Sequence, residues 1–105
     1  MGTQLSNQEI LQQLITQMAE RYGVTESNDI EQVVIIDHEH GVYQIYEIGW
    51  KNHERVKTPW IHIRLKAGKF WIEEDWTEES IATRLIDAGI SHDRIVLAFN
   101  PPDVR

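Results

Sequence analysis

Two clusters and one isolated histidine have residue types that could do chemistry. In Asp37-His38-Glu39-His40, two histidines two residues apart on a strand would point to the same side, as a metal pair requires. A polar turn between two strands accounts for the same residues, because a metal site also needs a third ligand and ordered outer partners. We therefore expect a turn here, with no metal and no other cofactor.

The isolated histidine, His62, could act as a general base, but a base needs a nucleophile or a substrate within reach. No Ser/His/Asp arrangement and no glycine-rich phosphate-binding loop accompanies it. We expect a structural or interface role for His62, no catalytic residues, and a protein that is not an enzyme.

An acidic cluster could bind a divalent cation or could stabilise the positive end of a helix. Its members are Glu73, Glu74, Asp75, Glu78 and Glu79. Acid-rich helix starts are common, so we expect the second role.

Basic side chains gather between residues 51 and 69, where Glu54 is the single acid. We call the following residues the basic strip: Lys51, Arg55, Lys57, His62, Arg64, Lys66 and Lys69. The strip is a candidate interface for a protein or for nucleic acid, and Trp50, Trp60 and Trp71 near it could stack on bases. We expect these tryptophans to alternate into the core, however, and the formal charge of −7 favours a protein partner over phosphate.

The composition limits the class of protein. The 105 residues suffice for one domain, which we expect to span residues 1–105. The absence of cysteine excludes disulfides and thiol chemistry. The N-terminus lacks the pattern of a signal peptide, and no apolar run approaches the roughly 18 residues of a membrane helix. We therefore expect a cytoplasmic protein without a membrane partner.

The N-terminal third predicts a helix over residues 7–22. Ser6 and Glu9 have the spacing of a capping box, in which each side chain accepts the other residue's amide. Apolar residues then recur at helical spacing up to Tyr22, and Gly23 follows as the expected terminator. Residues 25–29 form a polar connector.

The middle of the chain predicts successive antiparallel strands. The apolar run 33–36 predicts a buried strand, and a second strand covers 42–48. Strand signals follow at 55–57, at 61–66 with strict alternation, and at 69–73, while Pro59 indicates a bulge or an edge. Short connections favour a meander.

A second helix is expected after this meander. Thr77 is its predicted cap, Trp76 is expected to pack against Ile81, and Gly89 ends it. Its inward residues are predicted to be Ile81, Ala82, Leu85 and Ile86. The apolar run 95–99 then predicts an interior strand. The fold class is therefore α+β, with a mostly antiparallel sheet of about five strands, an N-terminal helix and a second helix between the last two strands.

Short fragments between Asp37 and Pro102 resemble the XisI family, the cyanobacterial fdxN-element excision controlling factors. The fragments are Tyr43, Gly49-Trp50, Arg55-Val56, His62-Ile63, Gly68-Lys69, Trp71-Ile72, Asp75, Thr77-Glu78, Ile81-Ala82, Gly89-Ile90 and 95–99 with Pro102. The resemblance implies a XisI-like α+β domain that acts in DNA recombination with a nuclease-like partner, XisH, which it could restrain. Direct DNA binding through the basic strip is the alternative. The sequence does not decide whether the chain forms a homo-oligomer.

The chain also departs from the family pattern. Trp76 stands where relatives usually have glycine, and Asn100 where they often have histidine. Relatives usually continue for several residues beyond the proline pair, so a function of that tail is put in doubt here.

Overall fold

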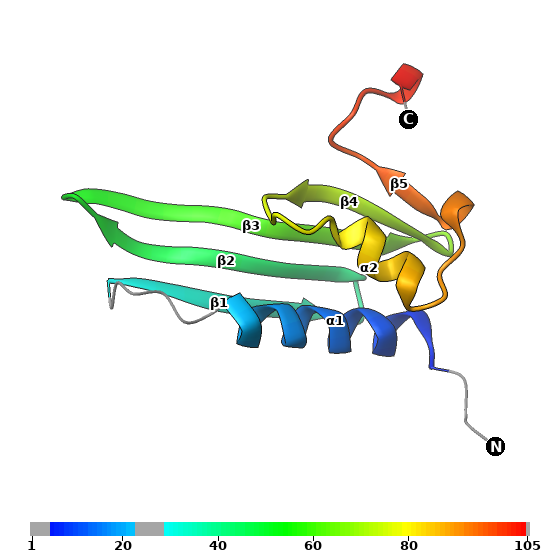
Figure 1. Ribbon diagram of the computed structural model, residues 1–105, viewed down its shortest axis with the longest axis horizontal. Helices are drawn as coiled ribbons and strands as arrows, with labels where there is room; N and C mark the ends of the chain where they lie inside the picture. Colours follow the sequence, from blue (N-terminus) through cyan, green and yellow to red (C-terminus); the bar gives the residue numbers. More distant parts are fainter. Residues whose placement is uncertain (1–4, 23–28, 105) are drawn as a thin grey trace.

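The computed structural model describes residues 5–22 and 29–104, which form two α-helices and a five-stranded sheet (Figure 1). In chain order the elements are α1 (Asn7–Tyr22), β1 (Ile30–Asp37), β2 (Val42–Lys51), β3 (Glu54–Lys66), β4 (Lys69–Asp75), α2 (Ile81–Asp87) and β5 (Ile95–Leu97), with short 3-10 helices at His92–Arg94 and Pro102–Val104. The predicted α+β class is confirmed.

The strands lie in the order of the sequence, β1-β2-β3-β4-β5. The first four strands pair antiparallel, so the predicted meander is confirmed. β5 pairs parallel with β4, and α2 supplies the crossover that a parallel connection requires. The second helix therefore lies between the last two strands, as expected.

Helix α1 begins with the predicted capping box. The Ser6 hydroxyl accepts the Glu9 amide at 3.2 Å, and the Glu9 carboxylate accepts the Ser6 amide at 3.4 Å. Its buried apolar stripe consists of Leu11, Leu14, Ile15 and Met18. The predicted bounds 7–22 are confirmed, while Gly23 and most of the connector 25–29 lie outside the described residues.

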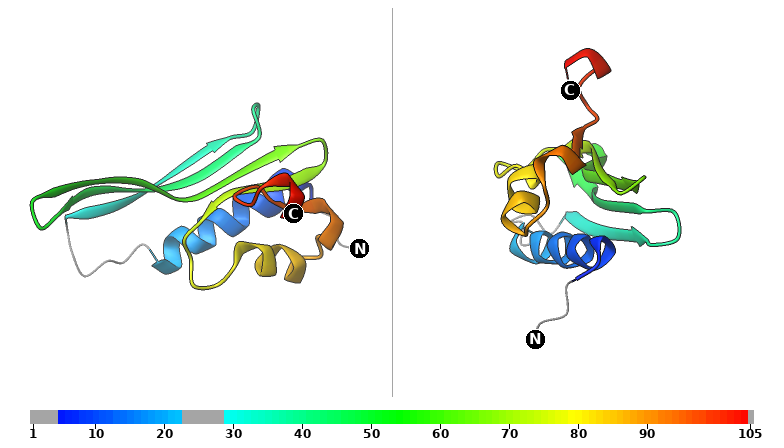
Figure 2. Two further views of the ribbon diagram at one scale, coloured as in Figure 1. Left: turned by 90° about the horizontal axis from the view of Figure 1, so that it is seen from above. Right: turned by 90° about the vertical axis from the view of Figure 1, so that its right-hand side faces the viewer.

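Both helices pack against the same face of the sheet, as the two views of Figure 2 show. We call this the inner face, and the opposite side the outer face. The sheet residues of the core are Tyr43, Ile45, Ile61, Ile63, Phe70 and Ile72, all fully buried. The predicted alternation at 61–65 is therefore correct, since every second residue of this segment reaches the core.

Two strands occupy other places than the sequence predicts. The run 95–99 is predicted to lie inside the sheet, but the strand order places β5 at an edge. β5 has only three residues, because the chain turns where the Asn100 amide donates to the Leu97 carbonyl. β1 forms the other edge, so its predicted burial is wrong for Val34 and Ile35, which are 39% and 41% exposed. An apolar run does not reveal how many neighbours a strand has.

Helix α2 starts later than predicted and ends where predicted. Its N-cap is Ser80, so Thr77 is not the cap, and Trp76 is 72% exposed instead of packing against Ile81. Ile86 is 37% exposed, against the prediction that it faces inward. At the C-terminus, Gly89 and Ile90 donate to the carbonyls of Ile86 and Leu85, the Schellman pattern.

Gly49 lets β2 approach the chain just before β1. The Trp50 amide donates to the Asp29 carbonyl at 2.9 Å, and a Cβ on Gly49 would lie 1.8 Å from that carbonyl oxygen. Backbone atoms form the obstacle, so a side chain here forces the two strands apart.

We expect Gly49→Ala to lower the free energy of unfolding by about 3 kcal/mol, because the added methyl group overpacks this contact. Urea denaturation measures the loss. Gly68→Ala is the matched control: φ is +75° there but no atom lies within 4 Å, so backbone strain of about 1 kcal/mol is the whole expected cost. Equal losses in the two variants would contradict the proposed contact.

Candidate functional site

A bulge at Trp60 interrupts the pairing of β2 with the central strand β3. Ile45 pairs with Ile61, but the next residue of β2, Tyr46, pairs with Pro59, so Trp60 is an extra residue in β3. This agrees with the bulge or edge that Pro59 predicted. The extra residue reverses the alternation of side chains along β3.

The reversal brings most of the basic strip to the outer face. His62, Arg64 and Lys66 alternate with the buried isoleucines and therefore point outward. In a regular strand, Arg55 and Lys57 would alternate to the opposite face from these residues. The extra residue at the bulge places them on the outer face as well. Lys69 pairs with Lys66 and shares its face. Lys51 alternates to the other side at the end of the hairpin, so the structure brings together six of the seven residues.

Three cations of the basic strip have defined neighbours. Arg64 donates to the Glu73 carboxylate at 3.3 Å. The Arg55 guanidinium lies 5.3 Å from the centre of the Trp50 ring, and the Lys66 ammonium lies 5.9 Å from that of Trp71. These contacts hold the side chains over the sheet and leave them partly exposed.

The tryptophans near the strip differ in burial. Trp60 packs against the core, as predicted. Trp50 is 54% exposed, and Trp71 pairs with Arg64 on the outer face, so the prediction of burial in the core is wrong for both. Their rings lie against the charged ends of Arg55 and Lys66 instead of filling the core.

Apolar residues also lie on the outer face, where the sequence patterns did not predict them. They are Val33, Ile35, Val42, Tyr46 and Ile48. The pairing of β1 with β2 and of β2 with β3 places their side chains on this face. A signal for them existed: the run 33–36 has no polar alternation, so half of it must point away from the helices. The outer face therefore combines aliphatic, aromatic and basic side chains.

His62 lies in the middle of this face, between Gln44 of β2 and Glu74 of β4. Burial lowers the pKa of His62; Glu73 and Glu74 oppose this shift, while Arg64 adds to it. The imidazole is half-buried among side chains of both charges, and it is favoured in its neutral form.

The acidic cluster is divided among separate partners. Glu73 pairs with Arg64, Glu74 accepts the Trp76 indole N–H at 2.8 Å, and Glu79 pairs with Arg84. Within residues 5–22 and 29–104, no group of three His, Asp or Glu side chains converges as a metal site requires.

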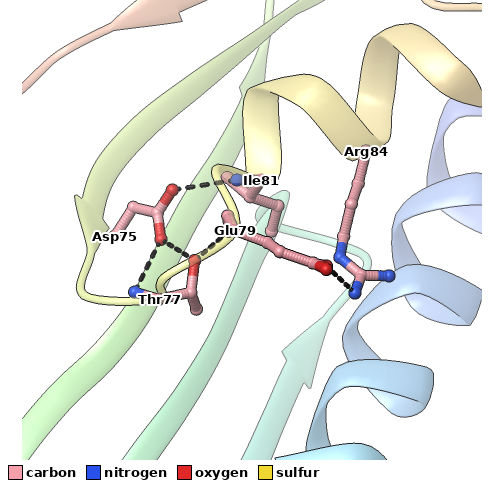
Figure 3. Close-up of polar contacts among 5 residues, drawn as sticks. All are labelled: Asp75, Thr77, Glu79, Ile81 and Arg84. Carbon is pink, nitrogen blue, oxygen red and sulfur yellow. Dashed lines mark hydrogen bonds and ion pairs between the residues drawn. The ribbon is translucent and has the colours of Figure 1, made fainter.

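Asp75 explains where α2 begins (Figure 3). One oxygen of its carboxylate accepts the Thr77 amide at 3.0 Å and the Thr77 hydroxyl, and the other accepts the Ile81 amide at 2.9 Å. A carboxylate from the end of β4 thus satisfies the first amide of the helix, in place of the predicted Thr77 cap.

The two histidines of the turn 38–41 have different hydrogen-bond partners. The His38 ring nitrogens lie 2.9 Å from the Tyr43 hydroxyl and 2.9 Å from the Gln12 amide oxygen. His40 lies 2.7 Å from the Asp37 carboxylate, and this hydrogen bond lowers the pKa of Asp37. His38 thereby links the turn to α1, and the polar turn that the sequence indicates is the geometry found.

A family model described as "XisI protein" matches residues 1–105. The chain belongs to the XisI family. Two crystal structures of XisI proteins from Anabaena variabilis have the same fold. A XisI-like protein is 31% identical with a TM-score of 0.86, over 93% of this chain and 88% of that chain. The fdxN element excision controlling factor XisI is 27% identical with a TM-score of 0.79, over 93% of both chains. No curated protein sequence matches.

The family resemblance drawn from the sequence is therefore correct, and it extends to the α+β architecture. In the part of the chain that the structure describes, no helix is both long and apolar enough to cross a membrane.

We expect Asp75→Ala to lower the free energy of unfolding by about 2 kcal/mol, because it leaves the first amide of α2 and two Thr77 groups without their acceptor. Urea denaturation measures this. Glu78→Ala, an exposed acid of the same loop, is the control and should change stability by less than about 0.5 kcal/mol. A small effect of Asp75→Ala would show that the loop holds α2 without it.

His62 should contribute to the pH dependence of stability. Its pKa in the folded state is lower than in the unfolded state, so the unfolded state binds more protons as the pH falls through about 6.5. Stability should therefore decrease between about pH 7.5 and 5.5, and His62→Gln should remove part of this decrease. Urea denaturation at both pH values tests this, with His92→Gln, which replaces an exposed histidine, as the control. If the free energy of unfolding falls between the two pH values as much in His62→Gln as in the unchanged protein, the expectation is wrong.

Proposed function

We propose that this chain is a non-enzymatic accessory factor that controls the excision of a DNA element by binding a nuclease-like XisH partner. Membership of the XisI family and the similarity to an fdxN element excision controlling factor support the process. Binding and restraining the partner is the mechanism that we propose for it.

The observation that carries the proposal is the composition of the outer face. Cations of the basic strip lie there beside Tyr46, Trp71 and aliphatic residues, on the side of the sheet that neither helix covers. Protein interfaces are enriched in aromatic residues and arginine, and their binding energy concentrates in such residues. A face of this composition suits a protein partner that offers apolar contacts together with carboxylates.

The charges favour a protein over DNA as the direct partner. The formal charge of −7 repels phosphate at long range. Partner carboxylates can form charge-assisted hydrogen bonds with Arg55 and Arg64 over a short range.

The absence of catalysis is part of the proposal. Four carboxylates of the acidic cluster have separate partners, and burial favours the neutral form of His62. These contacts support structural and binding roles for the groups that the sequence offers for chemistry.

Direct DNA binding is the second candidate, because the bulge aligns Arg55, Lys57, Arg64 and Lys66 along one strand. Exposed Trp50 and half-buried Trp71 beside them could stack on bases. About four phosphate contacts would give a steep salt dependence and modest affinity.

We expect replacement of Arg55, Lys57, Arg64 and Lys66 by glutamine to weaken binding to the XisH-like partner at least about tenfold, because the charged contacts of the interface are lost. Co-purification and calorimetry with that partner measure the effect. Folding should change little, since exposed charges contribute little to stability.

The control introduces negative charge on the exposed side of α1 through Gln13→Glu, Thr16→Glu and Gln17→Glu, and should bind normally. Fluorescence anisotropy with labelled duplex DNA separates the two candidates. Submicromolar DNA binding at about 150 mM salt, lost in the fourfold variant, would overturn the partner proposal in favour of DNA binding.

A further inference from the structure

The β2–β3 hairpin runs past the end of β4 (Figure 1). A groove lies at this place, lined by residues outside the basic strip. Its volume is about 440 Å³. Its walls come from β2, β3, the end of β4 and the start of the loop to α2: Glu47, Thr58, Pro59, Trp60, Glu74 and Trp76. Among the residues that the structure describes, the lining thus contains two indoles and two carboxylates and no cationic side chain.

The two tryptophans are held beside each other by the backbone. The Trp76 amide donates to the Trp60 carbonyl at 3.0 Å, which continues the pairing of the two segments beyond β4. Trp60 packs against the core, so one wall of the groove is fixed.

The exposed wall is also positioned. Trp76 is 72% exposed, and its indole N–H donates to the Glu74 carboxylate at 2.8 Å. The hydrogen bond orients the ring and keeps the carboxylate next to it. A large aromatic side chain held in place at the surface has the properties of an interface hot spot.

The chemistry of the lining selects a cation. The face of an indole attracts a positive charge, and carboxylates add to that attraction. An apolar group would desolvate Glu47 and Glu74 without pairing them, and an anion would be repelled by both.

We propose that this groove binds an arginine side chain presented by a protein partner. A guanidinium is planar, stacks on aromatic rings and donates to carboxylates from its edge, whereas an ammonium acts as a compact point charge. Trp76 offers an exposed ring, and Glu47 and Glu74 offer acceptors, so arginine satisfies more of the groove than lysine. This site goes beyond the proposed function, because it uses acidic and aromatic residues where the basic strip uses cations.

The test follows the four indole N–H resonances of the protein by NMR, one for each tryptophan, assigned with single Trp→Phe variants. The probe is N-acetyl-arginine amide, and the neutral control is the isosteric citrulline derivative. We expect the signals of Trp60 and Trp76 to shift saturably with the arginine probe and to remain unchanged with citrulline.

Variants then locate the site. Glu47→Gln combined with Glu74→Gln should weaken binding of the arginine probe at least about fivefold, and Trp76→Ala should do the same by removing one ring. The matched control Glu54→Gln removes an exposed acid at the hairpin turn, outside the groove, and should leave affinity unchanged.

Three results would overturn the proposal: the absence of saturable shifts, an equal response of Trp50, or affinity insensitive to the Glu47/Glu74 variant. Equal or tighter binding of N-acetyl-lysine amide would overturn the choice of arginine. The probe is a small molecule, so a failure to bind it would not change the interpretation of the experiment with the XisH-like partner. Likewise, a failure to bind that partner would not change the interpretation of the probe titration.

Discussion

The extra residue at Trp60 determines which side chains of the central strand lie on each face of the sheet. Without it, the alternation that buries Ile61 and Ile63 would direct Arg55 and Lys57 toward the inner face. With it, one strand supplies two residues to the core and a line of cations to the opposite face. The basic strip is therefore a product of the irregularity in β3, because a regular strand would divide it between two faces.

Coverage of one sheet face is the second constraint. Both helices pack on the inner face, so the fully buried residues come from that side alone. The outer face keeps aromatic and aliphatic residues half-exposed beside charged ones, a composition that is common at protein interfaces. The amphipathic α1 and the Asp75 contacts that begin α2 hold the inner layer, and neither helix covers the outer face.

Charged groups have separate roles in this arrangement. Asp75 and Glu79 act within the loop and helix α2, whereas Glu47 and Glu74 line a groove with Trp60 and Trp76. The chain thus offers two surfaces of opposite character, the basic outer face and the acidic aromatic groove. A protein with a formal charge of −7 can present both, because short-range contacts depend on local charges more than on the total.

Local signals in the sequence are enough to predict several elements of the fold. The Ser6/Glu9 box, the alternation at 61–65 and Gly89 each depend on residues a few positions apart, and each was predicted correctly. Family membership followed from the order of short fragments along the chain. Tertiary contacts place Val34 and Ile35 at an edge, bring the Asp75 carboxylate to the first amide of α2, and keep Trp50 and Trp71 outside the core. These features depend on which segments become neighbours, and the free energy of that choice comes from contacts between residues distant in sequence.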